Sequence, residues 1–196
     1  MSSFYPAAIN VRFNAPRQAI KCEQTNATGT AAAPECGTYL KFRLSIDADS
    51  KTIESSSFGT NGCGFMVAAG DALAELVRGR RLTDLHGSNS ADWSAELTRK
   101  LGRFPSDRSH CALTSIDAMK AAFNDFRTRQ IEEFAGEKAL ICTCFGVSEE
   151  IIEREIRHSG ALTVEDIGLR CNAGTGCGSC QLMIQELIDA ARHETG

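Results

Sequence analysis

Four cysteines near the C-terminus are spaced like the ligands of a metal site. Cys142 and Cys144 are separated by one residue, and Cys177 and Cys180 follow in the segment Gly174-Thr-Gly-Cys-Gly-Ser-Cys180. Two pairs of thiolates that meet in space suit an iron–sulfur cluster or a zinc ion. Glycines let the backbone approach a cluster closely and turn its N–H groups toward it. The pattern therefore indicates metal chemistry.

Three alternatives compete with a cluster at these cysteines. A structural zinc site uses the same four thiolates. A redox dithiol at Cys177 and Cys180 leaves Cys142 and Cys144 unexplained, and inert buried thiols do not explain the flanking glycines. Cys171 is interpreted as an ordinary half-buried thiol outside the site.

A second set of metal-binding side chains lies upstream. Cys36, Cys63 and Cys111 each lie beside a glycine or at the expected start of a helix, and His110 directly precedes Cys111. Thiols in such positions are expected to have lowered pKa values and to be reactive. Three thiolates and one imidazole form a Cys₃His set that suits iron or zinc. By spacing alone, His110 is also explained as a helix cap or a surface residue.

Hydrophobic periodicity predicts a hairpin and a helix around the first two of these cysteines. Apolar and polar residues alternate over 38–47, and a turn at 47–50 leads to a second strand at 52–58. The loop that carries Cys63 follows. A helix is predicted after this loop, and it ends near Gly79. Cys36 is thus expected just before the first strand of the hairpin, and Cys63 in the loop after the second.

Helices are expected to dominate the rest of the chain. One or two short helices are predicted over 83–101, with Trp93 and Leu97 as core residues, and a longer helix over 111–127. The polar stretch 128–139 is the predicted linker. Three further helical patterns follow, of which the first is capped by Ser148.

Composition narrows the classes of function. The chain has 196 residues, of which 42% are hydrophobic, enough for one large or two small domains. A net charge of −4 without long charge runs gives no reason to expect a nucleic-acid or membrane partner. No stretch reaches transmembrane length, and the N-terminus lacks signal-peptide features, so a cytoplasmic protein is expected. Nine cysteines, an odd number, favour metal ligation or thiol chemistry over structural disulfides.

The C-terminal segment resembles the [2Fe–2S] domain of bacterioferritin-associated ferredoxin, which is also the middle module of NifU proteins. The resemblance covers residues 140–192 and is carried by Cys142-Thr-Cys144-Phe-Gly-Val-Ser and by Ala173-Gly-Thr-Gly-Cys177-Gly-Ser-Cys180-Gln. It implies a permanent [2Fe–2S] cluster bound by Cys142, Cys144, Cys177 and Cys180.

Residues 10–127 resemble the NifU/IscU-type scaffold domain. The matching pieces are Phe13-Asn-Ala-Pro16-Arg17, Pro34-Glu-Cys36-Gly37, Gly62-Cys63-Gly64, and His110-Cys111 followed by Ala118-Met-Lys-Ala-Ala122-Phe. The resemblance implies an α+β fold. A small antiparallel sheet packed by helices is expected over residues 1–127, then the linker at 128–139 and a small, mostly helical domain over 140–196.

The resemblance implies a scaffold for iron–sulfur cluster assembly, not an enzyme. In that family the residues that match Cys36, Cys63 and Cys111, with the one that matches His110 or an aspartate, hold a transient [2Fe–2S] or [4Fe–4S] cluster, and such a site also accepts zinc. A cysteine desulfurase delivers the sulfur, and the cluster passes to apo-proteins. We expect Cys111 to receive the persulfide sulfur, because a helix-terminal thiolate is a good nucleophile. An electron donor acting through the permanent cluster and a homodimer are further expectations.

Three features depart from the family pattern. Thr38 stands where the family usually has an aspartate that is tied to cluster lability, so altered cluster exchange is expected. The segment Phe104-Pro-Ser-Asp-Arg108 replaces the Leu-Pro-Pro-Val-Lys that a chaperone reads in IscU-type members, so dependence on that chaperone is doubtful. The chain lacks the last Cys-x-x-Cys domain of full-length NifU, which indicates a two-domain variant or a truncated chain.

Two other functions remain open. The first is a ferredoxin-like module for electron transfer or iron release, with the N-terminal domain as a passive docking unit. The second is a zinc-dependent structural adaptor or desulfurase activator. Loading of a second cluster on Cys36, Cys63 and Cys111 separates these hypotheses from a scaffold. Cys22 is interpreted as a plain thiol, with a role as a spare sulfur acceptor as the alternative.

Overall fold

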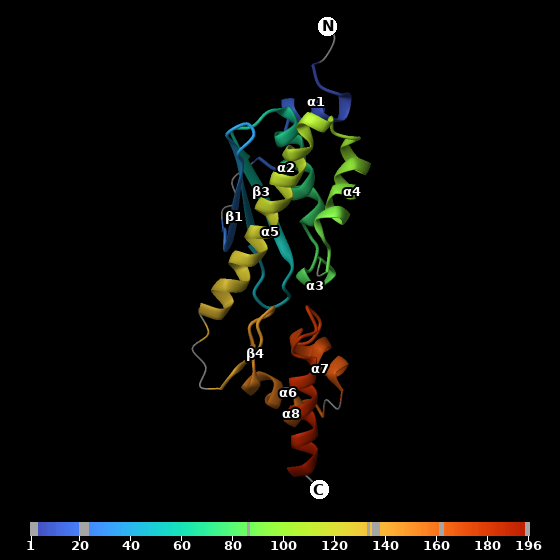
Figure 1. Ribbon diagram of the computed structural model, residues 1–196. Coiled ribbons are helices and arrows are strands. Elements are labelled where there is room, and N and C mark those ends of the chain that lie inside the picture. The colour runs from blue at the N-terminus through green and yellow to red at the C-terminus, as the bar shows by residue number, and fades with distance from the viewer. Residues whose placement is uncertain are drawn as a thin grey trace. The chain divides into compact units, whose positions relative to one another are not determined.

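The computed structural model describes residues 4–19, 24–85, 87–132, 134, 138–160 and 163–194 (Figure 1). The chain divides into two compact units, one formed by residues 1–82 with 88–126 and the other by residues 83–87 with 127–196. The N-terminal unit combines a three-stranded sheet with helices, and the C-terminal unit is mostly helical, which confirms the predicted α+β fold. Cys22 lies outside the described residues.

A three-stranded antiparallel sheet is the framework of the N-terminal unit. The central strand β2 (Thr38–Ile46) pairs with β1 (Ala27–Ala33) on one side and with β3 (Ile53–Thr60) on the other. The predicted hairpin is therefore confirmed. Its alternating apolar side chains are buried, as predicted: Leu40, Phe42, Leu44 and Ile46.

Strand β1 was not predicted from the sequence. Its residues, Ala-Thr-Gly-Thr-Ala-Ala-Ala, include few of the branched and aromatic types that favour strands. Packing explains why it forms. A Cβ atom on Gly29 would lie 2.2 Å from both the carbonyl oxygen of Ala118 and the nitrogen of Ala122, in helix α5 (Ser109–Glu132). Small residues thus allow the backbone of the helix to approach the strand.

Helix α2 (Gly64–Val77) packs on the apolar face of the same sheet. A Cβ atom on Gly70 of this helix would lie 2.7 Å from a ring carbon of Phe58 and 2.9 Å from a methyl carbon of Leu40. The predicted segment 83–101 forms α3 (Leu82–Leu85) and α4 (Ser90–Leu101). Trp93 and Leu97 of α4 are buried, as predicted. A single 3₁₀ turn, η1 (Ser106–Arg108), precedes α5.

Helix α5 is longer than the sequence predicted. It ends at Glu132 rather than near residue 127, so the first part of the predicted linker 128–139 is helical. This part of the chain has the polar, straight-chain residues Arg129, Gln130 and Glu132, which favour a helix without an apolar stripe to mark it. Of the remaining linker, residues 133 and 135–137 lie outside the described residues.

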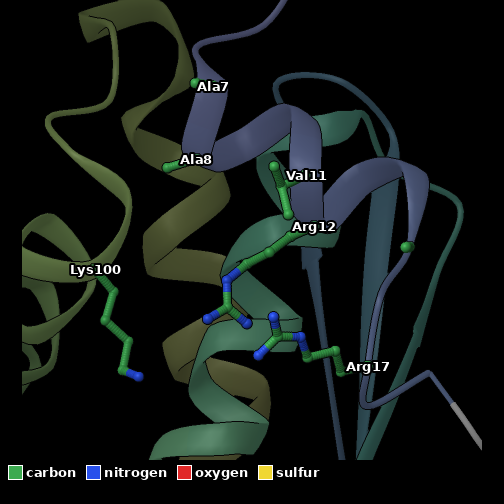
Figure 2. Close-up of a pocket in the computed structure, with 7 residues that line it drawn as sticks. Ala7, Ala8, Val11, Arg12, Arg17 and Lys100 are labelled. Atoms are coloured by element: carbon green, nitrogen blue, oxygen red, sulfur yellow. The ribbon is translucent and has the colours of Figure 1, made fainter.

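Charged side chains hold α1 (Ala7–Asn14) on α2. Arg12 of α1 forms ion pairs with Asp71 and Glu75 of α2, and Lys100 of α4 pairs with Glu75 at 2.8 Å. Hydrogen bonds from Lys100 and Arg12 lower the pKa of Glu75 to about 2. Asp71 is fully buried and also accepts a hydrogen bond from the backbone N–H of Gln18. Arg12 and Lys100 line a cavity of about 320 Å³, into which both side chains reach (Figure 2).

From residue 138 onward, the described residues of the C-terminal unit form a short hairpin and three helices: β4 (Leu140–Cys142), β5 (Val147–Ser148), α6 (Glu149–Ser159), α7 (Val164–Cys171) and α8 (Gln181–Glu194). The hydroxyl of Ser148 accepts the N–H of Ile151 and caps α6, as predicted. The helices meet through fully buried isoleucines: Ile152, Ile167, Ile184 and Ile188. None of the helices in the described part of the chain is long and apolar enough to cross a membrane.

Candidate metal centres

The upstream thiols lie at three boundaries between elements of the N-terminal unit. Cys36 lies in the turn between β1 and β2, Cys63 occupies the N-cap position of α2, and Cys111 lies in the first turn of α5 directly after His110. Each thiol is thus at a boundary between elements, as predicted, and the sheet and two helices determine their separation.

The side chains of these residues form one connected group. The Sγ atoms of Cys63 and Cys111 are 3.8 Å apart. Nε2 of His110 lies 3.4 Å from Sγ of Cys36 and 3.5 Å from Sγ of Cys111. The structure therefore brings together all four residues that the sequence predicts as one site, although they come from positions as far apart as 36 and 111.

The three thiols differ strongly in exposure. Cys36 is exposed, Cys63 is half-buried and Cys111 is 1% exposed. Burial, together with the negative charge of Cys63, raises the pKa of Cys111 to about 12. The lowered pKa that its position in the sequence suggested is therefore wrong, because removal from water outweighs the positive end of α5.

Thr38 has a direct contact with the exposed thiol. Its Oγ1 atom lies 3.0 Å from Sγ of Cys36, within hydrogen-bonding distance. A hydroxyl can donate a hydrogen bond to a thiolate, whereas an ionised carboxylate has no hydrogen to donate and adds a negative charge. Compared with an aspartate at this position, Thr38 thus adds a hydrogen-bond donor beside Cys36 and leaves out a negative charge.

The C-terminal cysteines are held by two loops of their own unit. Cys142 is the last residue of β4, and Cys144 lies in the tight turn before β5. Cys177 and Cys180 lie in the glycine-rich loop that ends at α8. The turn at Cys144 allows two cysteines separated by one residue to face the same site.

These four thiols meet in two pairs around a cavity. Sγ of Cys144 lies 3.4 Å from Sγ of Cys177, and Cys142 and Cys180 form a second hydrogen-bonded pair. All four line a cavity of about 260 Å³. Hydrogen bonds from Ser179 lower the pKa of Cys177 to about 7, whereas burial raises the pKa of Cys180 to about 11. Cys177 is the exposed member of the set.

Comparison with protein families agrees with both sites. Residues 4–133 match the NifU-like N-terminal domain, and residues 140–190 match the BFD-like [2Fe–2S] binding domain. The chain belongs to the NifU-like family. Each matched region contains one of the two sets of thiols. The family comprises scaffolds for iron–sulfur cluster assembly, here with a BFD-like [2Fe–2S] binding domain.

Individual relatives support the same assignment. The nitrogen fixation protein NifU of Azotobacter chroococcum mcd 1 is 29% identical over 193 residues, which cover 96% of this chain and 61% of that protein. The mitochondrial iron sulfur cluster assembly protein 2 of Saccharomyces cerevisiae is 30% identical over 130 residues, covering 65% of this chain and 80% of that protein. This NifU-like chain spans 53–61% of the length of four NifU proteins that it matches.

A solved structure supports the fold of the N-terminal unit. A nitrogen-fixing NifU-like protein (N-terminal) from Brucella abortus is similar with a TM-score of 0.50 and 14% identity, over 63% of this chain and 94% of that one. At this level of identity the likeness concerns the fold alone. The α+β architecture of the NifU-like chain is thereby supported independently of its cysteines.

The thiol pairs have separations that suit thiolates bound to one metal. Among the described residues, no group of three or more Cys, His, Asp or Glu side chains is arranged as a complete site for a metal ion, so the thiols are considered in pairs. Two thiolates on one tetrahedral metal, with bonds of about 2.3 Å, lie roughly 3.8 Å apart. The Cys63–Cys111 pair at 3.8 Å and the Cys144–Cys177 pair at 3.4 Å are close to this separation. These separations suit zinc as well as the irons of an iron–sulfur cluster.

A glycine substitution tests whether the backbone of the C-terminal loop is needed for its site. Gly178 has a φ of +74°, and a Cβ atom there would meet nothing closer than 3.7 Å. Gly178→Ala should therefore act through the backbone alone, at a cost of about 1–2 kcal/mol. We expect the visible absorption of the C-terminal cluster to be lost at lower urea concentration. In Gly178→Asn this urea concentration should fall less, since asparagine tolerates a positive φ. An equal fall in both variants would contradict a purely backbone effect.

The structure also adds residues that the sequence analysis missed. Ser179 contacts the sulfur of Cys177 at 3.2 Å, and Tyr5 contacts the loop that carries Cys63. No sequence signal identified Tyr5, which is 58 residues before that thiol. Cys171 is half-buried, as predicted, and its thiol donates to the carbonyl of Ile167. The eight cysteines in the described ranges are all free thiols.

Proposed function

We propose that this chain is a scaffold that assembles an iron–sulfur cluster on Cys36, Cys63, His110 and Cys111 and then transfers it to apo-proteins. The observation that carries the proposal is the convergence of these four side chains with one thiol, Cys36, exposed to incoming reactants. The cluster is cargo, so the chain acts without the turnover of an enzyme. Zinc competes with iron for the same four side chains. The homodimer expected from the sequence stays a prediction.

Sulfur enters this site through the exposed thiol. A cysteine desulfurase presents a persulfide, and the thiolate of Cys36 attacks its outer sulfur. The new S–S bond forms at Cys36 as the old one breaks, and the cysteine of the desulfurase leaves as a thiolate, so no net oxidation occurs. The burial of Cys111 argues against it as the first acceptor, contrary to the sequence-based expectation.

The C-terminal site supports the assembly step by carrying electrons. Cys142, Cys144, Cys177 and Cys180 would hold a permanent [2Fe–2S] cluster, which carries one electron at a time. Sulfane sulfur must gain two electrons to become sulfide. Ferrous iron supplies only part of them when both irons end as ferric, so an external electron donor must supply the rest. The group held by these four cysteines would provide the one-electron chemistry for that supply. Exposed Cys177 marks the side that such a donor reaches.

An electron-transfer or iron-release module is the second candidate function. It is favoured by apolar side chains exposed on α8 beside the C-terminal cavity, where Leu182 is 72% and Met183 is 42% exposed. Met183 also lines that cavity. Apolar surface around a redox site is suited to docking a protein partner. In this alternative the N-terminal unit serves only for docking.

Anaerobic reconstitution with iron, cysteine and a desulfurase decides between the two functions. The scaffold should bind about four irons per chain, which a brief chelator challenge reduces to about two, because only the C-terminal cluster is permanent. Cys36→Ala should remove the labile fraction, whereas Cys171→Ala, a cysteine outside both sites, should not. Two irons throughout, unaffected by Cys36→Ala, would leave the electron-transfer function as the better conclusion.

A further inference from the structure

The N-terminus of α2 obtains a hydrogen-bond acceptor from an unexpected part of the chain. The first N–H groups of a helix have no partner within it, and Ser, Thr, Asp or Asn usually supplies one at the N-cap. Cys63 occupies the N-cap of α2 and makes no such side-chain bond. The N–H of Gly64 instead donates to the hydroxyl oxygen of Tyr5 at 3.1 Å.

Gly64 makes room for this contact. A Cβ atom on Gly64 would lie 2.7 Å from both Cε2 and Cζ of Tyr5, which is too close for any side chain. The ring of Tyr5 therefore lies directly against the backbone that follows Cys63. Gly64, the second glycine of Gly62-Cys63-Gly64, is therefore needed for the close approach of Tyr5.

Two further sets of contacts keep Tyr5 in this place. Its ring packs edge-on against Phe65 with the ring centroids 5.4 Å apart, and against Phe13 at 5.3 Å. The helix that follows Tyr5 is tied to α2 by the ion pairs of Arg12 with Asp71 and Glu75. The segment from Tyr5 to Asn14 is thus anchored along α2, with the phenol at the end that carries Cys63.

We propose that Tyr5 is a positioning residue of the N-terminal cluster site. Its hydroxyl holds the first amide of α2, and its ring covers the backbone beside Cys63, so that the thiol is presented toward Cys111 and His110. This inference rests on the proposed function, since it assigns Tyr5 to the site that builds the cluster. Tyr5 acts through the loop and does not itself bind iron.

Tyr5→Phe tests the hydroxyl because it keeps the ring. In the metal-free full chain, at one fixed pH, we expect iodoacetamide to alkylate Cys63 about threefold faster relative to Cys36, as the unanchored loop opens more often. Peptide mapping by mass spectrometry gives this ratio without any cluster. In the reconstituted chain, the labile irons should be lost to a chelator about threefold faster, and the visible circular dichroism of the labile cluster should change.

Tyr39→Phe is the matched control. It removes the same hydroxyl from the other tyrosine of the chain, which is 46% exposed on β2. It should leave both the alkylation ratio and the release rate at wild-type values. Tyr5→Ala, which also removes the ring, should exceed Tyr5→Phe in both.

The two kinds of readout separate failure of this inference from failure of the proposed function. An unchanged Cys63/Cys36 alkylation ratio in Tyr5→Phe overturns the role of Tyr5, whatever the wild type binds. Wild-type protein that never loads a labile cluster overturns the proposed function, and the alkylation ratio then still decides whether Tyr5 positions the thiol.

Discussion

Cys36→Ser is expected to abolish the first sulfur transfer from a cysteine desulfurase to the N-terminal site, whereas Cys111→Ser is expected to leave it nearly unchanged. The reason is access. Cys36 is exposed in the turn between β1 and β2, while Cys111 is 1% exposed and its pKa is raised to about 12 by burial. A persulfide on a second protein cannot reach a buried thiol, and a protonated thiol is a poor nucleophile.

Mass spectrometry of the chain after a brief incubation with desulfurase and cysteine measures this effect. The initial rate of gain of one sulfur atom should fall by more than about tenfold in Cys36→Ser. Cys171→Ser controls for the loss of any one thiol, because Cys171 lies outside both sites. Wild-type rates of sulfur gain in Cys36→Ser, with the added sulfur mapped to Cys111, would show that the buried thiol is the first acceptor after all.

Thr38→Asp is expected to release the N-terminal cluster about tenfold faster, equivalent to about 1.4 kcal/mol. The hydroxyl of Thr38 lies 3.0 Å from the sulfur of Cys36 and can donate to the thiolate. Aspartate removes that donor and adds a negative charge beside an anionic ligand, so the bound state loses stability. The rate of transfer to an apo-ferredoxin, followed by circular dichroism, measures the change.

Two smaller substitutions separate the hydrogen bond from the charge. Thr38→Ser keeps the hydroxyl and should transfer at the wild-type rate. Thr38→Val keeps the shape without the donor and should lie between the wild type and Thr38→Asp. If Thr38→Asp transferred its cluster no faster than the wild type, Thr38 would not control cluster release in this chain.

The elements that the sequence predicted well are those with strong local signals. The alternation along β2, the end of α2 near Gly79 and the cap of α6 at Ser148 are set by neighbouring residues, and the structure confirms them. Strand β1 has no such signal, because its place depends on how closely Gly29 approaches α5. The end of α5 was missed for a related reason, since solvent-exposed polar residues extend it without an apolar stripe.

The identities of the site residues also came from the sequence. The cysteines and His110 were recognised by type, spacing and flanking glycines, and each set converges in the structure. What spacing did not predict was the environment of each thiol. Desolvation depends on what covers a residue in three dimensions, so Cys111 was taken for a reactive thiol although burial makes it the least accessible one.

The sequence by itself thus determined the family, the α+β class and the two sets of metal-binding residues, because these depend on local patterns and on motifs. Only the tertiary structure decided which thiol faces the solvent, that Thr38 contacts Cys36, and that Tyr5 reaches the loop of Cys63. These are contacts between segments up to 59 residues apart, and they form through packing of the sheet, α1 and α2, which no local pattern encodes.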